Sequence, residues 1–98
     1  MQNLAGSWTE ISSGEMVEIR KLKDQNDNYM FNFFLSKESF LVHADTKDQL
    51  SGYLTGLKRY LKSDPDERLH FAIEKGSNLV IKSSDKKLLA TFRSNSED

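Results

Sequence analysis

Short stretches in which apolar and polar residues alternate recur along most of the chain. Between residues 15 and 22, for example, Val17 and Ile19 alternate with charged side chains, which is typical of a strand with one buried face. Polar clusters rich in Asn, Asp, Ser and Gly separate these stretches about every eight to twelve residues. The same period of two predicts further strands at residues 7–11, 29–35, 40–44, 68–74, 78–82 and 87–93.

This rhythm indicates an all-β domain with antiparallel rather than parallel strands. Because every connection is short, neighbouring strands are expected to pair in chain order. An up-and-down meander of eight such strands closes into a small barrel. The 98 residues suit a single domain, 1–98, whose ends at 1–4 and 94–98 we expect to be flexible.

Residues 49–62 are compatible with two structures. An amphipathic helix over about 47–61 places Leu50 and the following leucines in one apolar stripe, which gives an α+β fold with the same sheet. A strand instead alternates Gly52 and Gly56 with polar neighbours. Glycine costs about 1 kcal/mol inside a helix, but it lets a barrel strand bend. The all-β barrel is our expected fold, and the α+β fold is the alternative.

Composition narrows the classes of function. Charged residues make up 30% of the chain, and the formal net charge is −1. Nucleic-acid-binding proteins usually carry a basic excess, so we expect no nucleic-acid partner. Because the chain has no cysteine, disulfides, thiolate nucleophiles and zinc–thiolate sites are excluded. The longest apolar run is about four residues, whereas a membrane-spanning helix needs about 20, so we expect no membrane span.

The first residues bear on the compartment. The segment Met1–Leu4 has neither the charged nor the apolar part of a signal peptide. Two compartments stay open. The protein is cytoplasmic if Met1 is the native start, and it is periplasmic or secreted if a leader has been removed.

Residues that could carry chemistry are few and scattered. His43 and His70 are the only histidines, and each is expected on an outward strand face without the three or four ligands that a metal site needs. None of the serines lies in the Gly-x-Ser-x-Gly setting of a nucleophile elbow. Gly52 and Gly56 are not followed by the Gly-Lys-Ser/Thr of a phosphate loop. We therefore expect neither an enzyme nor a bound metal or cofactor.

The first and last predicted strands carry a pattern found in known barrels. Gly6-Ser7-Trp8, together with Phe92-Arg93, resembles the closure of the calycin group, which contains the lipocalins, the fatty-acid-binding proteins and avidin. The chain also resembles the short lipocalin-like domains of uncharacterised bacterial proteins. The resemblance implies that Trp8 plugs the closed end of the barrel and that Arg93 lies over its ring. Such a cation–π contact is worth about 1–2 kcal/mol when desolvated.

Two non-catalytic functions follow from this fold. In the first, the protein is a binding module of calycin type that holds an apolar or lipid-like ligand inside the barrel. An eight-stranded barrel is either filled by its own side chains or holds one small ligand. The ligand would contact Phe31, Phe33, Leu54 and Phe71.

In the second function, the barrel is filled and the protein acts through its surface. Met30, Phe34 and Leu41 alternate with the predicted core residues and therefore point outward. An exposed apolar surface marks contact with another protein or a second copy of the chain. These residues would then mediate protein–protein interaction or dimerisation. The sequence leaves the ligand and the oligomeric state open.

Overall fold

The computed structural model describes residues 4–23, 27–48, 50–61, 64, 66–74 and 78–95. The polar clusters at 23–28, 63–67 and 75–77 predict turns, which lie wholly or partly outside this described part of the chain. The same holds for residues 1–3 and 96–98 of the ends that we predicted to be flexible. Next to these ends, Leu4 is buried and Ser94 belongs to the last strand.

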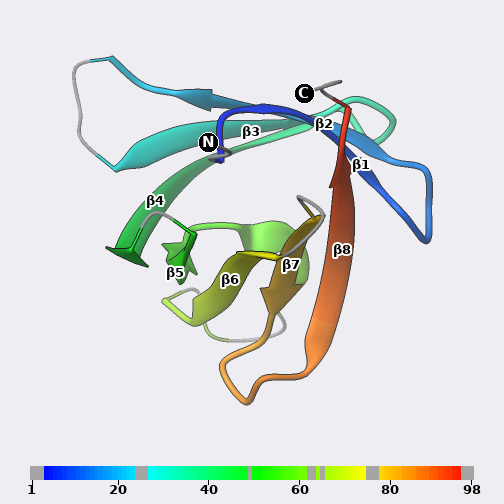
Figure 1. Ribbon diagram of the computed structural model, residues 1–98. Helices are drawn as coiled ribbons and strands as arrows, with labels where there is room; N and C mark the ends of the chain where they lie inside the picture. Colours follow the sequence, from blue (N-terminus) through cyan, green and yellow to red (C-terminus); the bar gives the residue numbers. More distant parts are fainter. Residues whose placement is uncertain are drawn as a thin grey trace.

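The described strands form one closed antiparallel barrel (Figure 1). Each strand pairs with the next in the chain, and the last pairs back with the first. This arrangement confirms the predicted up-and-down meander. The strands are β1 (Gly6–Glu10), β2 (Met16–Lys21), β3 (Asn28–Phe33), β4 (Glu38–Asp48), β5 (Ser51–Thr55), β6 (Arg68–Glu74), β7 (Asn78–Lys82) and β8 (Leu88–Ser94), with a short 3-10 helix η1 (Lys58–Tyr60) between β5 and β6.

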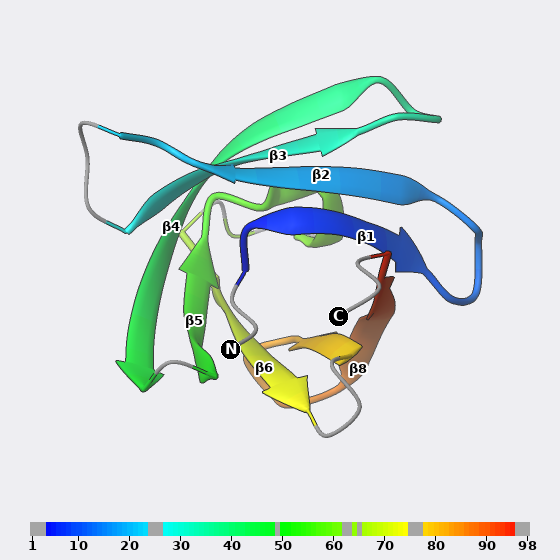
Figure 2. The same ribbon diagram turned by 45° about the horizontal axis from the view of Figure 1, so that its top comes forward.

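Alternation along each strand divides the side chains between the barrel interior and the outer wall. In β6, Leu69, Phe71 and Ile73 are buried, whereas Arg68 and Glu74 at the two ends are exposed. The strands run around the ring in Figure 2. The inward side chains therefore share one core, whose burial stabilises the fold by about 25 cal/mol for each Å² of apolar surface removed from water.

Strand β4 is longer than predicted. The polar residues 45–48 predicted that this strand ends at Ala44, but it continues to Asp48. The additional length contains a bulge, because the pairing of β4 with β5 shifts register between Thr46 and Asp48. A bulge leaves an extra residue on one strand, and here that residue is Lys47. Pairing with β5 keeps this polar segment in the sheet although it buries little.

Residues 51–55 form strand β5, so the strand alternative is confirmed and the amphipathic helix at 47–61 is wrong. Gly52 fits this strand, because a Cβ at this position would clash with the carbonyl oxygen of Asp45 on β4. Only glycine permits such a close approach of two backbones. After β5 the chain makes the single turn η1, which we did not predict. No helix in the described ranges has the length and apolar character required to cross a membrane.

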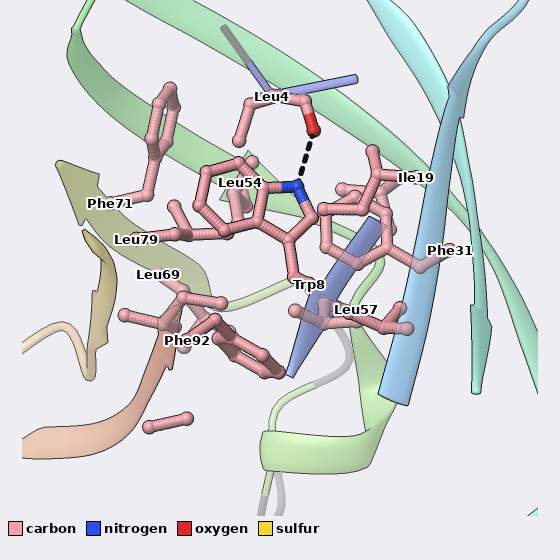
Figure 3. Packing of buried hydrophobic residues seen from close by; sticks show 14 of the residues in the cluster. Leu4, Trp8, Ile19, Phe31, Leu54, Leu57, Leu69, Phe71, Leu79 and Phe92 are labelled. Atoms are coloured by element: carbon pink, nitrogen blue, oxygen red, sulfur yellow. Dashed lines mark hydrogen bonds between the residues drawn. The ribbon is translucent and has the colours of Figure 1, made fainter. Parts of the chain in front are cut away.

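The tryptophan of β1 fills the centre of the barrel. Trp8 is 0% exposed, and its indole Nε1 donates a hydrogen bond to the carbonyl oxygen of Leu4, 3.0 Å away (Figure 3). The segment before β1 therefore folds over the ring, and the buried N–H keeps the partner that a buried polar group needs. Buried side chains from six strands and from the chain after β5 pack in the same cluster: Ile19, Phe31, Leu54, Leu57, Leu69, Phe71, Leu79 and Phe92.

Arg93 does not lie over this ring. The pairing of β1 with β8 sets Thr9 opposite Arg93 on the outer wall. Opposite residues in antiparallel strands point to the same face, and the inward position on β8 belongs to Phe92, which is buried. Arg93 is exposed, whereas Trp8 points inward. The structure thus corrects the contact between Arg93 and Trp8 that the resemblance implies.

The central position of Trp8 leads to a stability prediction. Replacement of Trp8 by Ala removes the largest core side chain, so we expect the free energy of unfolding to fall by about 3–5 kcal/mol. Arg93→Ala removes only an exposed side chain and is expected to change it by less than about 0.5 kcal/mol. Urea-induced unfolding measures both values. A desolvated cation–π contact is worth about 1–2 kcal/mol. A fall of more than about 1 kcal/mol in the free energy of unfolding of Arg93→Ala would therefore contradict the exposed position of Arg93.

Candidate functional site

The four residues predicted to contact a ligand lie together inside the barrel. Phe31, Phe33, Leu54 and Phe71 are all buried, and all belong to the cluster that packs with Trp8. The interior of an eight-stranded barrel is just wide enough for side chains to fill it or for one small ligand to enter. Here Phe31, Leu54 and Phe71 pack around the indole (Figure 3), and Phe33 belongs to the same buried cluster.

The three residues predicted to form an outer apolar surface do not form one patch. Met30 and Leu41 face each other across β3 and β4, whereas Phe34 lies in the turn after β3. Between them lies a polar pair, in which the Ser39 hydroxyl donates to Asn32 Oδ1 at 2.7 Å. Phe34 is 50% exposed and Leu41 is 56% exposed. Both are therefore available to a partner, but on separate areas.

A groove of about 330 Å³ lies on the outer wall over β5, β6 and β7. Its volume is at the lower end of the range of small-molecule sites. Residues of these three strands, the bulge of β4 and the turn between β7 and β8 line it. Of the four predicted ligand contacts, Phe71 alone belongs to this lining.

The strand register explains the shape of the groove. Outward residues that lie opposite one another in neighbouring strands form rows across the barrel wall. A row of small residues runs across β5, β6 and β7, and beside it runs a row of large ones, so the wall is hollowed between them. The small row, here the floor row, is Ser51, Ala72 and Val80; the large row, here the wall row, is Tyr53, His70 and Lys82.

Val80 is a buried residue on the outer wall at one end of the floor row. Val80 lies between the inward residues Leu79 and Ile81, so it points outward. An outward residue on the wall of a small barrel normally faces water, yet Val80 is only 7% exposed. The larger side chains on either side of the floor row therefore cover Val80, whereas Ser51 and Ala72 stay partly exposed.

The lining carries three positive charges against one negative charge. Lys82 stands in the wall row, Lys47 projects from the β4 bulge, and Lys86 lies in the turn between β7 and β8. Glu74 is the acidic residue of the lining. In the described part of the chain, none of the three lysines forms an ion pair with a carboxylate. The groove thus offers unpaired positive charge beside an apolar floor.

The turn that carries Lys86 is held tightly. The N–H of Lys86 donates to the carbonyl oxygen of Ser83, and the N–H of Ser83 donates to that of Lys87, both at 2.8 Å. The Ser83 hydroxyl also donates to Asp85, and this hydrogen bond lowers the pKa of the Asp85 carboxyl from its usual value. The backbone under Lys86 is therefore fixed before any ligand arrives.

The aromatic ring of the wall row is also held in place. Tyr53 and His70 lie with ring centroids 4.8 Å apart and a tilt of 53°. The guanidinium carbon of Arg68 lies 4.4 Å from the centroid of the Tyr53 ring, and Arg68 pairs with Asp45 at 2.9 Å. These contacts fix the Tyr53 side chain, so the groove is largely pre-formed.

A second cluster of charged residues closes the end of the barrel at which η1 lies. The guanidinium carbon of Arg59 lies 4.7 Å from the centroid of the Phe33 ring, and the guanidinium pairs with Glu38 and, at 3.6 Å, with Glu15. Glu15 also accepts two backbone N–H groups of the β3–β4 turn, at 2.6 and 3.2 Å. The cluster ties η1 to two turns, so we assign it to barrel closure. Arg59, rather than Arg93, makes the cation–π contact at this end.

Tyr60 lies beside this cluster. Its hydroxyl is buried and has no hydrogen-bond partner among the described residues. Burial raises the pKa of Tyr60 to about 12, and the negative charge of Glu10 adds to this effect. The nearby Arg59 guanidinium acts in the opposite direction but does not outweigh them.

The two histidines do not meet. His43 is exposed on β4, where its Nδ1 lies 3.2 Å from Asn28 Oδ1, and His70 stands in the groove against Tyr53. Across the described ranges, no three His, Asp or Glu side chains gather closely enough to hold a metal ion.

Comparisons of the chain with models of known protein families, with curated proteins and with solved structures find no match. The groove therefore has to be interpreted from its own residues. We did not predict it from the sequence, because Lys47 reaches it only through the bulge in β4. One signal was present: Val80 is an apolar residue at a position whose alternation points outward.

The buried hydroxyl of Tyr60 leads to a second stability prediction. Between pH 10 and 12 the folded chain keeps a proton on Tyr60 that the unfolded chain loses, so stability falls as the pH rises through this window. With allowance for partial exposure, we expect a loss of about 1–2 kcal/mol. Tyr60→Phe removes the titrating hydroxyl and is therefore expected to abolish this loss. Urea unfolding of the wild-type protein and of Tyr60→Phe at several pH values measures this loss. If the free energy of unfolding falls equally in both proteins, Tyr60 is not the cause of the loss.

Proposed function

We propose that this protein is a non-catalytic binding module that holds a small ligand in the groove on its outer wall. The observation that carries the proposal is the burial of the outward-facing Val80, which marks a recessed apolar position on the solvent side of the barrel. A groove of about 330 Å³ whose lysines have no carboxylate partner among the described residues suits a small molecule with both apolar and charged parts.

The filled interior supports the outer wall as the binding surface. A ligand inside the barrel has to displace Trp8 or its neighbours, each of which loses buried apolar surface when it moves. A ligand in the groove displaces only water. The meander topology agrees with the calycin resemblance, and we retain membership of that group as a prediction, with the ligand on the outside rather than the inside.

Among the described residues, no serine hydroxyl of the groove has a histidine as its hydrogen-bond partner. The Ser51 hydroxyl donates to Asp48 Oδ1 at 3.3 Å, and the described partner of His70 is the Tyr53 ring. A serine nucleophile needs a base within hydrogen-bond reach. This arrangement supports binding without chemistry.

Nuclear magnetic resonance can test the proposal with a library of small aromatic fragments. We expect fragments to shift the backbone amide signals of Ser51, Ala72 and Val80 and to leave those of the interior Phe31 and Leu54 unchanged. Ala72→Phe fills the floor row and is expected to abolish the shifts.

The matched control for this substitution is Leu41→Phe, which adds an aromatic ring to the outer wall away from the groove and is expected to leave the shifts intact. Shifts centred on Phe31 and Leu54 would favour a ligand inside the barrel and contradict the proposal. The absence of any shift at the groove would contradict it as well.

A second candidate function is contact with a protein partner or a second copy of the chain. The exposed apolar side chains of Phe34 and Leu41 favour it. If the chain dimerises through Phe34, sedimentation velocity shows a dimer that grows with concentration and that Phe34→Lys abolishes. Leu41→Lys is the matched control on the separate apolar area. A monomer at every concentration would exclude dimerisation.

A further inference from the structure

The groove indicates the chemical class of its ligand. We propose that it binds a small aromatic anion, whose flat ring lies along the floor row and whose carboxylate or phosphate group lies at the lysines. This inference rests on the proposed function of the groove as a binding site and adds the ligand's charge and shape to it.

The spacing of the outward rows sets the width of the groove. Along β6, His70 and Glu74 flank Ala72 and stand four residues apart, which separates their Cα atoms by about 13 Å. The two flanking side chains occupy part of this distance, so the remaining space suits a flat ring better than a bulky branched group.

The floor row sets the length and the apolar character. It crosses three neighbouring strands, β5 to β7, so its end residues lie about 10 Å apart. Two fused aromatic rings match this length. Ala72, which is only partly buried, offers the rings an exposed apolar surface beside the buried Val80, and covering this surface removes it from water.

The lysines set the charge of the ligand. Lys82 and Lys86 line the groove at its β7 end, and Lys47 lines it at its β5 end. Because none of them has a carboxylate partner among the described residues, each can form a charge-assisted hydrogen bond with an anionic group. The apolar rings of one ligand then lie along the floor row, and its anionic group lies at the lysines of one end of the groove.

Glu74 limits how much negative charge the ligand carries. It belongs to the same lining, and like charges at short range repel. A polyanion such as a nucleic acid would be repelled by this carboxylate and by the formal net charge of −1 of the chain. A ligand with a single anionic group avoids both, and the volume of about 330 Å³ fits a small molecule rather than a peptide with several side chains.

Four related compounds can test the inference in titrations followed by backbone amide signals. Naphthoate has flat rings and a carboxylate, naphthamide is its neutral counterpart, decalin carboxylate keeps the charge but is not flat, and naphthyl phosphate replaces the carboxylate by a phosphate. We expect naphthoate to shift the amides of Ala72 and Val80 and to bind about tenfold more tightly than naphthamide or decalin carboxylate. The phosphate arm shows which anionic group the lysines prefer.

Paired lysine substitutions locate the charge effect. Lys47→Gln with Lys82→Gln is expected to weaken naphthoate binding about fivefold to tenfold and to change naphthamide binding little. The matched control is Lys21→Gln with Lys58→Gln, which makes the same change in net charge on exposed residues outside the groove. We expect this control to change naphthoate binding by less than about twofold.

The outcomes separate this inference from the proposed function. If naphthamide binds in the groove as tightly as naphthoate, or if the control pair weakens naphthoate as much as the groove pair, the groove binds small molecules but the anion inference is wrong. If decalin carboxylate matches naphthoate, the requirement for a flat ring is wrong. If no compound shifts the groove amides, the proposed function fails together with the inference.

Discussion

An eight-stranded barrel has a nearly fixed diameter, and the central space it leaves is close to the size of one large side chain with its neighbours. Trp8 takes that space. Its indole is anchored to the carbonyl oxygen of Leu4, so the chain before β1 closes over the core that the strands enclose. The rest of the structure depends on this arrangement. Because side chains fill the inside, we propose that a ligand binds on the outer wall.

The groove on the outer wall arises from strand register and from one bulge. Pairing of β5, β6 and β7 sets small outward residues in one row and large ones in the next, which hollows the wall without any additional layer. The bulge in β4 then brings Lys47 to one end of this hollow. Fixed contacts around Tyr53 and in the turn of Lys86 hold the lining in place. Such pre-organisation lowers the entropy cost of binding.

Much of the fold could be predicted from the sequence because strand alternation is a local property. The bounds of β6 and β7 match the predicted segments, and the inward residues of β2 are those that alternation indicated. The length of β4 could not be predicted, because pairing with β5 holds polar residues that on their own are typical of a turn. The close approach at Gly52 is also a property of two strands rather than of one.

The candidate site was less predictable, because it depends on how several strands pair rather than on the alternation within one strand. Phe31 and Leu54 were identified correctly as inward residues, but alternation does not show whether a barrel interior is filled or empty. The face of the barrel wall on which Arg93 lies depends on the register between β1 and β8. A shift of one residue would move its side chain from the outer to the inner face. The groove combines residues of four strands and one turn, so only the assembled barrel brings them together.

The central claim is that Trp8 fills the barrel and that the interior accepts no ligand. Because Trp8 is the only tryptophan, a fluorine atom on its indole gives one fluorine resonance that reports on the interior. The account predicts a single resonance that stays unchanged when a fatty acid such as laurate is added at high concentration. A resonance that shifts or splits progressively with laurate, while the protein stays folded, would show that the interior opens to an apolar ligand and would contradict the account.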